Sequence, residues 1–164
     1  MHPKHHSKLM IMLLALLSFW VAPATGQGVA RLQVMATSSP NDAVHLSLDA
    51  LDAMEQIEFT TTTIWTDGDI HFTGVPLKAL LDQLGLVGST VEMVALNDYS
   101  IAMPVKDLED DAPIVATRMN GKAMSVRDKG PYWVVFPYDK DPKYSTETNY
   151  SRSIWQLNRL KVVD

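Results

Sequence analysis

Short segments with alternating or continuous apolar residues recur along the chain. Between Ile57 and Trp65 every second residue shares one face, and Thr60 to Thr63 are β-branched, so this segment is predicted to be a strand. Similar patterns predict strands at Leu32–Met35, Ile70–Phe72, Val91–Leu96, Tyr99–Met103, Pro113–Met119, Lys122–Val126, Trp133–Phe136 and Ile154–Val163. Strands therefore dominate the predicted structure.

Helical spacing is clearest in Leu77–Leu84, where leucines recur at intervals of three and four residues. Pro76 suits the first position of this helix, and Gly85 suits the left-handed conformation that ends it. A second short helix is predicted over Leu48–Met54 with Ser47 as its N-cap, because a serine oxygen accepts a hydrogen bond from a free backbone N–H.

Turn residues separate these segments. Asp67-Gly68 and Asn120-Gly121 are typical of tight hairpin turns. Pro104–Leu108 is predicted to form a helical turn, and Tyr138–Tyr150 a long polar loop that we expect to be able to move. Two or three short helices among many strands, without regular βαβ alternation, predict an α+β fold.

The N-terminus has a separate pattern. A basic segment with Lys4 and Lys8 precedes an apolar run over Leu9–Ala22, and Ala22-Pro23-Ala24 supplies the small residues that a signal peptidase reads. We therefore predict a signal peptide over residues 1–24, a single domain over residues 25–164, and a periplasmic product. An uncleaved anchor is the alternative. His2, His5 and His6 would leave with the signal.

Composition excludes several chemistries. The 164 residues include no cysteine, which excludes disulfides, thiolate metal sites and cysteine nucleophiles. The net charge of -5 argues against nucleic-acid binding, which depends on Lys and Arg. His45 and His71 lack the spacing of a zinc site, and the run Asp107–Asp111 lacks the alternating ligands of a calcium loop, so a solvated acidic turn is favoured there.

Four motifs follow one another along the chain: Phe72–Leu81 with its Gly-Val-Pro-Leu, Ala95–Pro104, Met119–Pro137 with Asn-Gly and Gly-Pro-Tyr-Trp, and Ser153–Leu157. Their order resembles that in the molybdopterin-binding domain of the sulfite oxidase superfamily. The resemblance covers about Ile57 to Val163. It implies that family's fold and a pterin-type cofactor.

The chain departs from the family at the metal ligand. Enzymes of the superfamily hold molybdenum through a cysteine, which lies four residues before a Trp on the strand preceding the Gly-x-Pro-Leu helix. Thr61 and Trp65 stand at these places here. A threonine hydroxyl is a hard, protonated donor and does not replace a thiolate, so no metal is expected. Trp133 stands where the enzymes often have Arg.

A pterin-type fold without its metal ligand is similar to a group of small periplasmic proteins. These are thought to bind a reduced pterin and to act on the periplasmic part of an inner-membrane diguanylate cyclase/phosphodiesterase, which sets the level of c-di-GMP. The resemblance thus implies a non-catalytic pterin sensor. Two alternatives stay open: a molybdopterin-dependent oxidoreductase, and a cofactor-free interaction scaffold.

A pterin ring requires an aromatic plane for stacking and polar groups around its rim. The candidate ligand-binding residues are Thr61, Trp65, Asn97, Asp98, Tyr99, Arg118, Tyr132, Trp133, Tyr138 and Arg152; Asp139 and Trp155 are further possible contacts. Each has an alternative role. The aromatic residues suit a core, Asn97-Asp98 suits a turn, the threonines suit a strand, and Arg118 suits pairing with an internal carboxylate.

Overall fold

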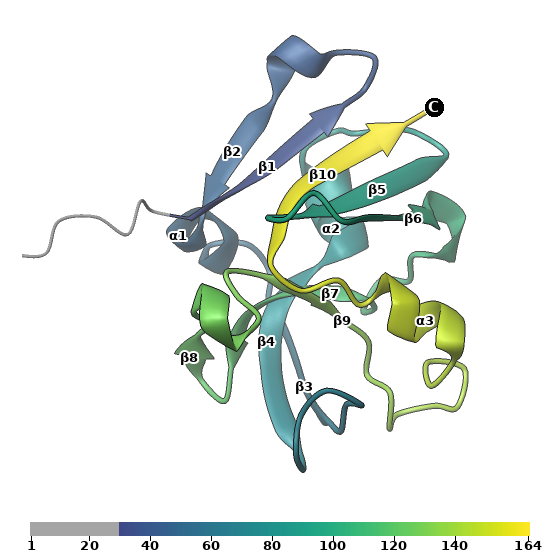
Figure 1. Ribbon diagram of the computed structural model, residues 1–164. Helices are drawn as coiled ribbons and strands as arrows, with labels where there is room; N and C mark the ends of the chain where they lie inside the picture. Colours follow the sequence, from purple (N-terminus) through teal and green to yellow (C-terminus); the bar gives the residue numbers. More distant parts are fainter. Residues whose placement is uncertain (1–29) are drawn as a thin grey trace, which may run out of the picture.

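Two five-stranded sheets form the fold of the computed structural model, which describes residues 30–164 (Figure 1). The first sheet has the order β2-β1-β10-β5-β6. Its strands are β1 (Arg31–Ala36), β2 (Val44–Ser47), β5 (Thr90–Ala95), β6 (Ser100–Pro104) and β10 (Leu157–Val163). β1 is parallel to β10, and the other neighbours are antiparallel. The predicted signal peptide, residues 1–24, lies outside the described residues.

The second sheet has the order β3-β4-β7-β8, and β9 pairs with β7. Its strands are β3 (Ile57–Thr61), β4 (Ile70–Pro76), β7 (Ile114–Met119), β8 (Lys122–Ala123) and β9 (Trp133–Val135). All pairs in this sheet are antiparallel. The predicted α+β class, with strands dominating, is confirmed.

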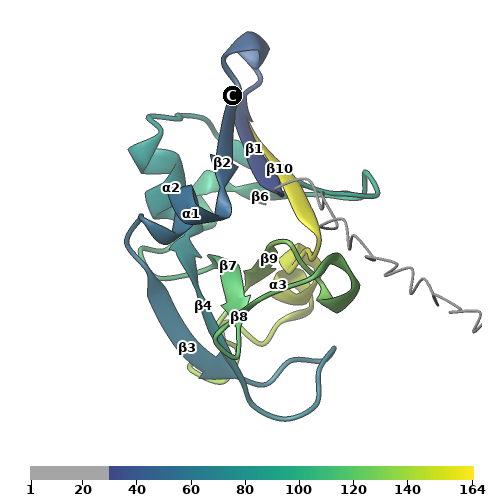
Figure 2. The ribbon, with the colours of Figure 1, turned by 90° about the vertical axis from the view of Figure 1, so that its left-hand side faces the viewer.

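Three short α-helices connect the strands: α1 (Leu48–Asp52), α2 (Leu77–Gln83) and α3 (Glu147–Arg152). The Ser47 hydroxyl accepts a hydrogen bond from the Ala50 backbone N–H at 3.1 Å, as its N-cap role predicts. Gly85 ends α2 with a φ of 64°. Helices α1 and α2 lie on the same side of the first sheet (Figure 2). No helix within residues 30–164 is long and apolar enough to cross a membrane.

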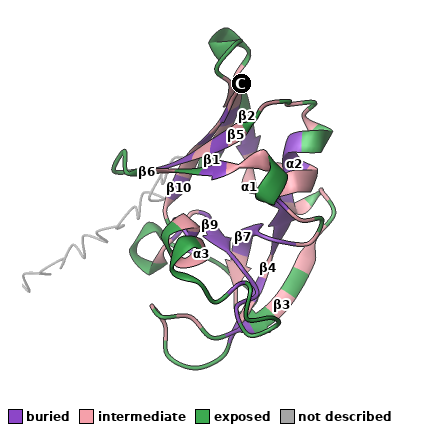
Figure 3. Ribbon diagram, turned by 90° about the vertical axis from the view of Figure 1, so that its right-hand side faces the viewer, coloured by how far each residue is buried: buried purple, intermediate pink, exposed green. Residues whose placement is uncertain are grey.

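The core lies along both sheets and on one face of α2 (Figure 3). The leucine stripe of α2 is wholly or almost wholly buried at Leu77, Leu80 and Leu81. Inward-facing residues of both sheets pack with it, among them Leu32, Phe72, Met93, Ile114, Trp133 and Leu160. Burial of these side chains is the main stabilising contribution to the fold.

Gly74 allows β4 and β7 to approach each other closely. The register of the pair shifts between Thr73 and Gly74. A Cβ atom at position 74 would overlap the Val115 carbonyl oxygen. Glycine is therefore required at this place in the Phe72–Leu81 motif, because a side chain would push the two strands apart.

Several element boundaries differ from the sequence predictions. Strand β3 ends at Thr61 rather than Trp65, because the Thr62 N–H donates to the Asp139 carboxylate at 2.5 Å. The predicted loop Tyr138–Tyr150 contains the start of α3, which begins behind a Thr146 N-cap. Strand β10 begins three residues later than predicted, at Leu157. Strand β2 was not predicted; its Val44–Ser47 is too short for a clear alternation.

Candidate functional site

A cleft of about 390 Å³ opens where the β5–β6 turn meets the segment that follows α3. Ala95, Asn97 and Tyr99 line it from the turn, and Trp65 lines it from the loop after β3. The opposite wall comes from the end of α3 and the segment after it: Tyr150, Ser151, Ser153, Ile154, Trp155 and Gln156. This volume is within the range of small-molecule sites.

Trp65 is the centre of an aromatic cluster beneath and beside the cleft. Its ring centroid lies 5.7 Å from that of Trp155, 5.8 Å from Trp133, 5.9 Å from Tyr150 and 6.4 Å from Tyr138. The rings meet at interplanar angles between 64° and 83°, which is the favourable edge-to-face arrangement. The cluster thus gives the cleft rigid aromatic walls.

The β5–β6 turn is shaped by its own side chains. Asp98 has a φ of 63°, and the Asn97 side-chain oxygen accepts a hydrogen bond from the Tyr99 N–H at 3.1 Å. The Asp98 carboxylate pairs with Arg159 of β10 at 2.5 Å. Asn97 and Tyr99 therefore line the cleft, while the charge of Asp98 is paired outside it.

The segment after α3 is held by backbone hydrogen bonds from several elements. The Gln156 carbonyl accepts from Leu96 and the Gln156 N–H donates to the Lys129 carbonyl, both at 2.9 Å. The Trp133 indole N–H donates to the Ser153 carbonyl at 3.1 Å. These bonds fix the wall formed by Trp155 and Gln156 relative to both sheets.

Within residues 30–164, no charged side chain lines the cleft. Its polar groups are the Asn97 and Gln156 amides, the Tyr99 and Tyr150 hydroxyls and the serines. The Gln156 amide N–H donates to the Val126 carbonyl at 2.8 Å, so this group already has a partner. The cleft is suited to an uncharged flat ring that stacks on an aromatic plane and hydrogen bonds at its edge.

Thr61 lies outside the cleft, in a tightly bonded corner. Its side chain is buried, and its hydroxyl donates to the Asp139 carboxylate at 3.1 Å and accepts from the Asp139 N–H at 3.1 Å. Asp139 also accepts from the Thr62 N–H and, at 3.0 Å, from the Thr62 hydroxyl. The Thr62 backbone N–H is the largest cause that holds the pKa of Asp139 below its ordinary value.

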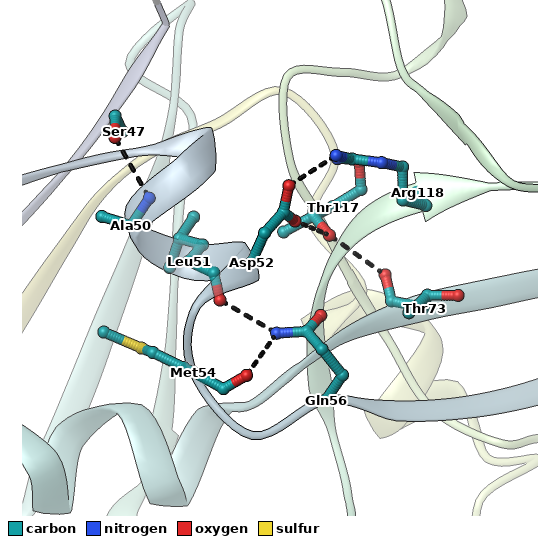
Figure 4. Close-up of polar contacts among 9 residues, drawn as sticks. All are labelled: Ser47, Ala50, Leu51, Asp52, Met54, Gln56, Thr73, Thr117 and Arg118. Carbon is teal, nitrogen blue, oxygen red and sulfur yellow. Dashed lines mark hydrogen bonds and ion pairs between the residues drawn. The ribbon is translucent and has the colours of Figure 1, made fainter.

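Arg118 belongs to a polar cluster between α1 and β7 (Figure 4), and it is not among the residues that line the cleft. Its guanidinium donates to the Asp52 carboxylate at 2.5 Å, and Thr117 donates to the other Asp52 oxygen at 3.3 Å. Gln56 donates to the Leu51 and Met54 carbonyls and so completes the end of α1. The internal carboxylate, one of the two partners expected for Arg118, is the partner that the structure shows.

Four other predicted residues also lie outside the cleft lining. Arg152 pairs with Asp107 at 3.2 Å. The Tyr132 hydroxyl donates to the Ala30 carbonyl, and burial raises the pKa of Tyr132 to about 12. Trp133 is fully buried beneath Trp65. Tyr138 is buried with its hydroxyl 2.5 Å from the Ser153 hydroxyl, and burial raises its pKa.

The acidic run Asp107–Asp111 is paired rather than simply solvated. Lys143 pairs with Glu109 at 2.8 Å, Lys140 with Asp111 at 2.6 Å and Lys78 with Asp110 at 2.5 Å. Two of these lysines belong to the loop after Tyr138, so the pairs hold that loop against the acidic run. In the described part of the chain, no group of three or more His, Cys, Asp or Glu side chains could hold a metal ion.

Sequence analysis identified Trp65, Asn97 and Tyr99 among the residues that line the cleft, and it noted Trp155. The other lining residues were not among its candidates: Ala95, Tyr150, Ser151, Ser153, Ile154 and Gln156. The polar stretch Glu147–Arg152 shows no apolar periodicity, so only Thr146 as an N-cap could have revealed the helix that carries Tyr150.

Comparison with known proteins gives one family and a structural neighbour. The sequence model of the oxidoreductase molybdopterin binding domain matches residues 28–139. The sulfane dehydrogenase SoxCD of Paracoccus pantotrophus has a similar structure, with a TM-score of 0.61 and 18% identity. The match covers 82% of this chain but 38% of that chain, and it concerns the fold alone. No curated protein matches the sequence.

Proposed function

The chain belongs to the oxidoreductase molybdopterin binding domain family, and on this premise we propose that it binds a pterin without a thiolate-held molybdenum. The observation that carries the proposal is the contrast between an open aromatic cleft and a closed Thr61 corner. The cleft suits the ring of a pterin, and the corner lacks the ligand that a molybdenum centre requires.

The residues at the metal position do not fit molybdenum. The chain has no cysteine to provide a soft thiolate. The Thr61 hydroxyl is buried, and it already donates a hydrogen bond to the Asp139 carboxylate and accepts one from the Asp139 N–H. A carboxylate beside this position would also disfavour a second anionic ligand there. We therefore derive no metal-dependent step for this protein.

The cleft does fit the pterin ring. Trp65, Tyr150 and Trp155 offer aromatic surfaces, while Asn97 and Tyr99 offer edge-directed polar groups. Molybdopterin carries a phosphate, and phosphate recognition in proteins uses Arg, Lys or helix N-termini. No Arg or Lys of residues 30–164 lines this cleft. The neutral lining thus favours a pterin that carries no phosphate.

The biological role that we propose is that of a periplasmic sensor. Its ligand state would be read by the periplasmic part of an inner-membrane diguanylate cyclase/phosphodiesterase. The support is the resemblance of the motifs to small periplasmic pterin-binding proteins, together with the lack of a cysteine that could hold molybdenum for redox catalysis. A sensor requires that the partner bind the two ligand states with different affinity.

The test uses the protein without residues 1–24. It is titrated with a tetrahydropterin in the absence of oxygen, and binding is monitored by tryptophan fluorescence. Saturable quenching is expected, and a phosphorylated pterin should bind more weakly because the cleft has no cation for the phosphate. Asn97→Ala should weaken binding, whereas Arg118→Lys, in the distant Asp52 cluster, should not. Binding that requires both the phosphate and added molybdate would instead support the oxidoreductase alternative.

A further inference from the structure

Lys129 places a positive charge against the aromatic wall of the cleft. Its Nζ lies 4.7 Å from the centroid of Trp155 and 5.5 Å from the centroid of Trp133. Both distances are within the range of a cation–π interaction, and the half-buried position of Lys129 reduces competition from water.

The backbone holds Lys129 in this place. Lys129 follows the 3₁₀ turn Val126–Asp128 and has a left-handed φ of 70°. Its carbonyl accepts the Gln156 N–H at 2.9 Å, and the Val126 carbonyl accepts the Gln156 side-chain N–H at 2.8 Å. The turn that presents the ammonium group is therefore attached directly to the cleft wall.

The ammonium group contacts the Trp155 ring but is not part of the cleft lining. It contacts the ring of Trp133, which is fully buried, and neither Lys129 nor Trp133 lines the cleft. Trp155 itself is 38% exposed and does line the cleft. The indole thus contacts both a cation that does not line the cleft and the cleft itself.

A cation in contact with an indole changes which rings stack well on that indole. The cation draws π-electron density toward itself, because the attraction is between the charge and the negative face of the ring. The indole then becomes a poorer electron donor toward a ligand ring that stacks on it. An oxidised pterin is electron-poor and stacks best on an electron-rich plane, whereas a reduced pterin is itself electron-rich.

We propose that Lys129 is a specificity-determining residue that makes the cleft prefer the reduced over the oxidised form of the same pterin. This inference rests on the proposed function, because it assumes that a pterin binds at Trp155. Lys129 would distinguish the reduced from the oxidised pterin through its effect on the Trp155 ring, without contacting the ligand directly.

The test compares dissociation constants for a tetrahydropterin and its fully oxidised form, measured without oxygen. Lys129→Met retains much of the side-chain length and removes the charge, and Lys129→Arg retains the charge. We expect Lys129→Met to reduce the preference for the reduced form by roughly threefold to tenfold, and Lys129→Arg to keep most of it.

The two proposals fail in different ways. If wild-type protein binds neither form, the proposed function fails and the inference fails with it. If both forms bind but Lys129→Met leaves the preference unchanged, the role of Lys129 is overturned and pterin binding stands. Should the methionine variant not fold, Lys129→Gln provides the same test, since it also removes the positive charge and should likewise reduce the preference.

Discussion

The cleft and the Thr61 corner lie at two ends of the same short segment, yet their chemistry is opposite. The cleft is open, neutral and aromatic, with Trp65 and Trp155 as walls. The corner has a buried Thr61 and an exposed, anionic Asp139 that receives three donors from Thr61 and Thr62. Trp65 follows Thr61 by only four positions in the sequence.

Under the proposed function, the chain keeps one part of a cofactor site and loses another. The aromatic surface proposed for the ring depends on packing among several elements. The metal position depends on a single side chain. Here that side chain is Thr61, and hydrogen bonds of Thr61 and Thr62 with Asp139 connect the end of β3 to the loop after Tyr138. Each region can be tested separately.

The largest expected effect is on ligand binding through Trp155. Trp155→Ala should weaken pterin affinity by roughly tenfold to a hundredfold, as loss of an aromatic stacking partner does for bases. Because Trp155 is 38% exposed, the fold should survive the substitution. Calorimetric titration measures the change, and Trp155→Phe is the matched control that keeps a plane. Equal affinity in wild type and Trp155→Ala would contradict the proposal that the pterin binds in the cleft.

The next effect is on stability through Asp139. Asp139→Ala should lower the free energy of unfolding by about 1 kcal/mol, because the buried Thr61 hydroxyl and the Thr62 N–H lose their acceptor. Asp69→Ala is the control, since Asp69 has no ion pair among the described residues. Chemical denaturation measures stability, and pterin affinity should change little. A large loss of affinity with unchanged stability would contradict the separation of the two regions.

A smaller effect is expected on the pH dependence of stability. The pKa of Asp139 is below its ordinary value of 3.8, chiefly because the Thr62 N–H donates to the carboxylate. The ionised form therefore stabilises the fold above the unfolded pKa, and this contribution is lost as the pH falls through the folded pKa. The stability difference between wild type and Asp139→Asn should shrink as the pH falls below about 4. A difference that grows in acid would contradict this assignment.

The smallest effect is expected from restoring the sulfur alone. Thr61→Cys should leave molybdenum at background level even when the protein is produced with molybdopterin. The Asp139 carboxylate beside the thiol would raise its pKa and reduce the thiolate that binds metal. Elemental analysis of the purified variant measures this, and stoichiometric molybdenum would show that the corner still accepts the metal.

Local patterns predicted most of the fold because each strand and helix carries its own signal. The leucine stripe of α2 and the Ser47 cap of α1 are examples in which spacing or a single cap residue determines the element. The end of β3 could not be predicted, since the acceptor that ends it, Asp139, is distant in sequence. The β-propensity of the threonines favoured an extended strand through Thr63, but the hydrogen bond from the Thr62 N–H to Asp139 ends the strand at Thr61.

The candidate site was less predictable because its walls come from distant segments. An aromatic residue signals a plane but not whether that plane is exposed, so buried Trp133 and cleft-lining Trp65 looked alike. A charged residue does not reveal its partner. The Asp52 that binds Arg118 and the Arg159 that binds Asp98 are both far away in sequence.

The most direct measurement is the amount of pterin and of molybdenum bound to the protein when it is purified from the periplasm under reducing conditions. After denaturation, released pterin is identified by mass and fluorescence, and molybdenum is determined on the same sample. We expect a pterin without phosphate in near-equimolar amount and molybdenum at background level. Molybdenum equimolar with a phosphorylated pterin would contradict the central claim, because the chain would then hold a complete redox cofactor despite its lack of cysteine.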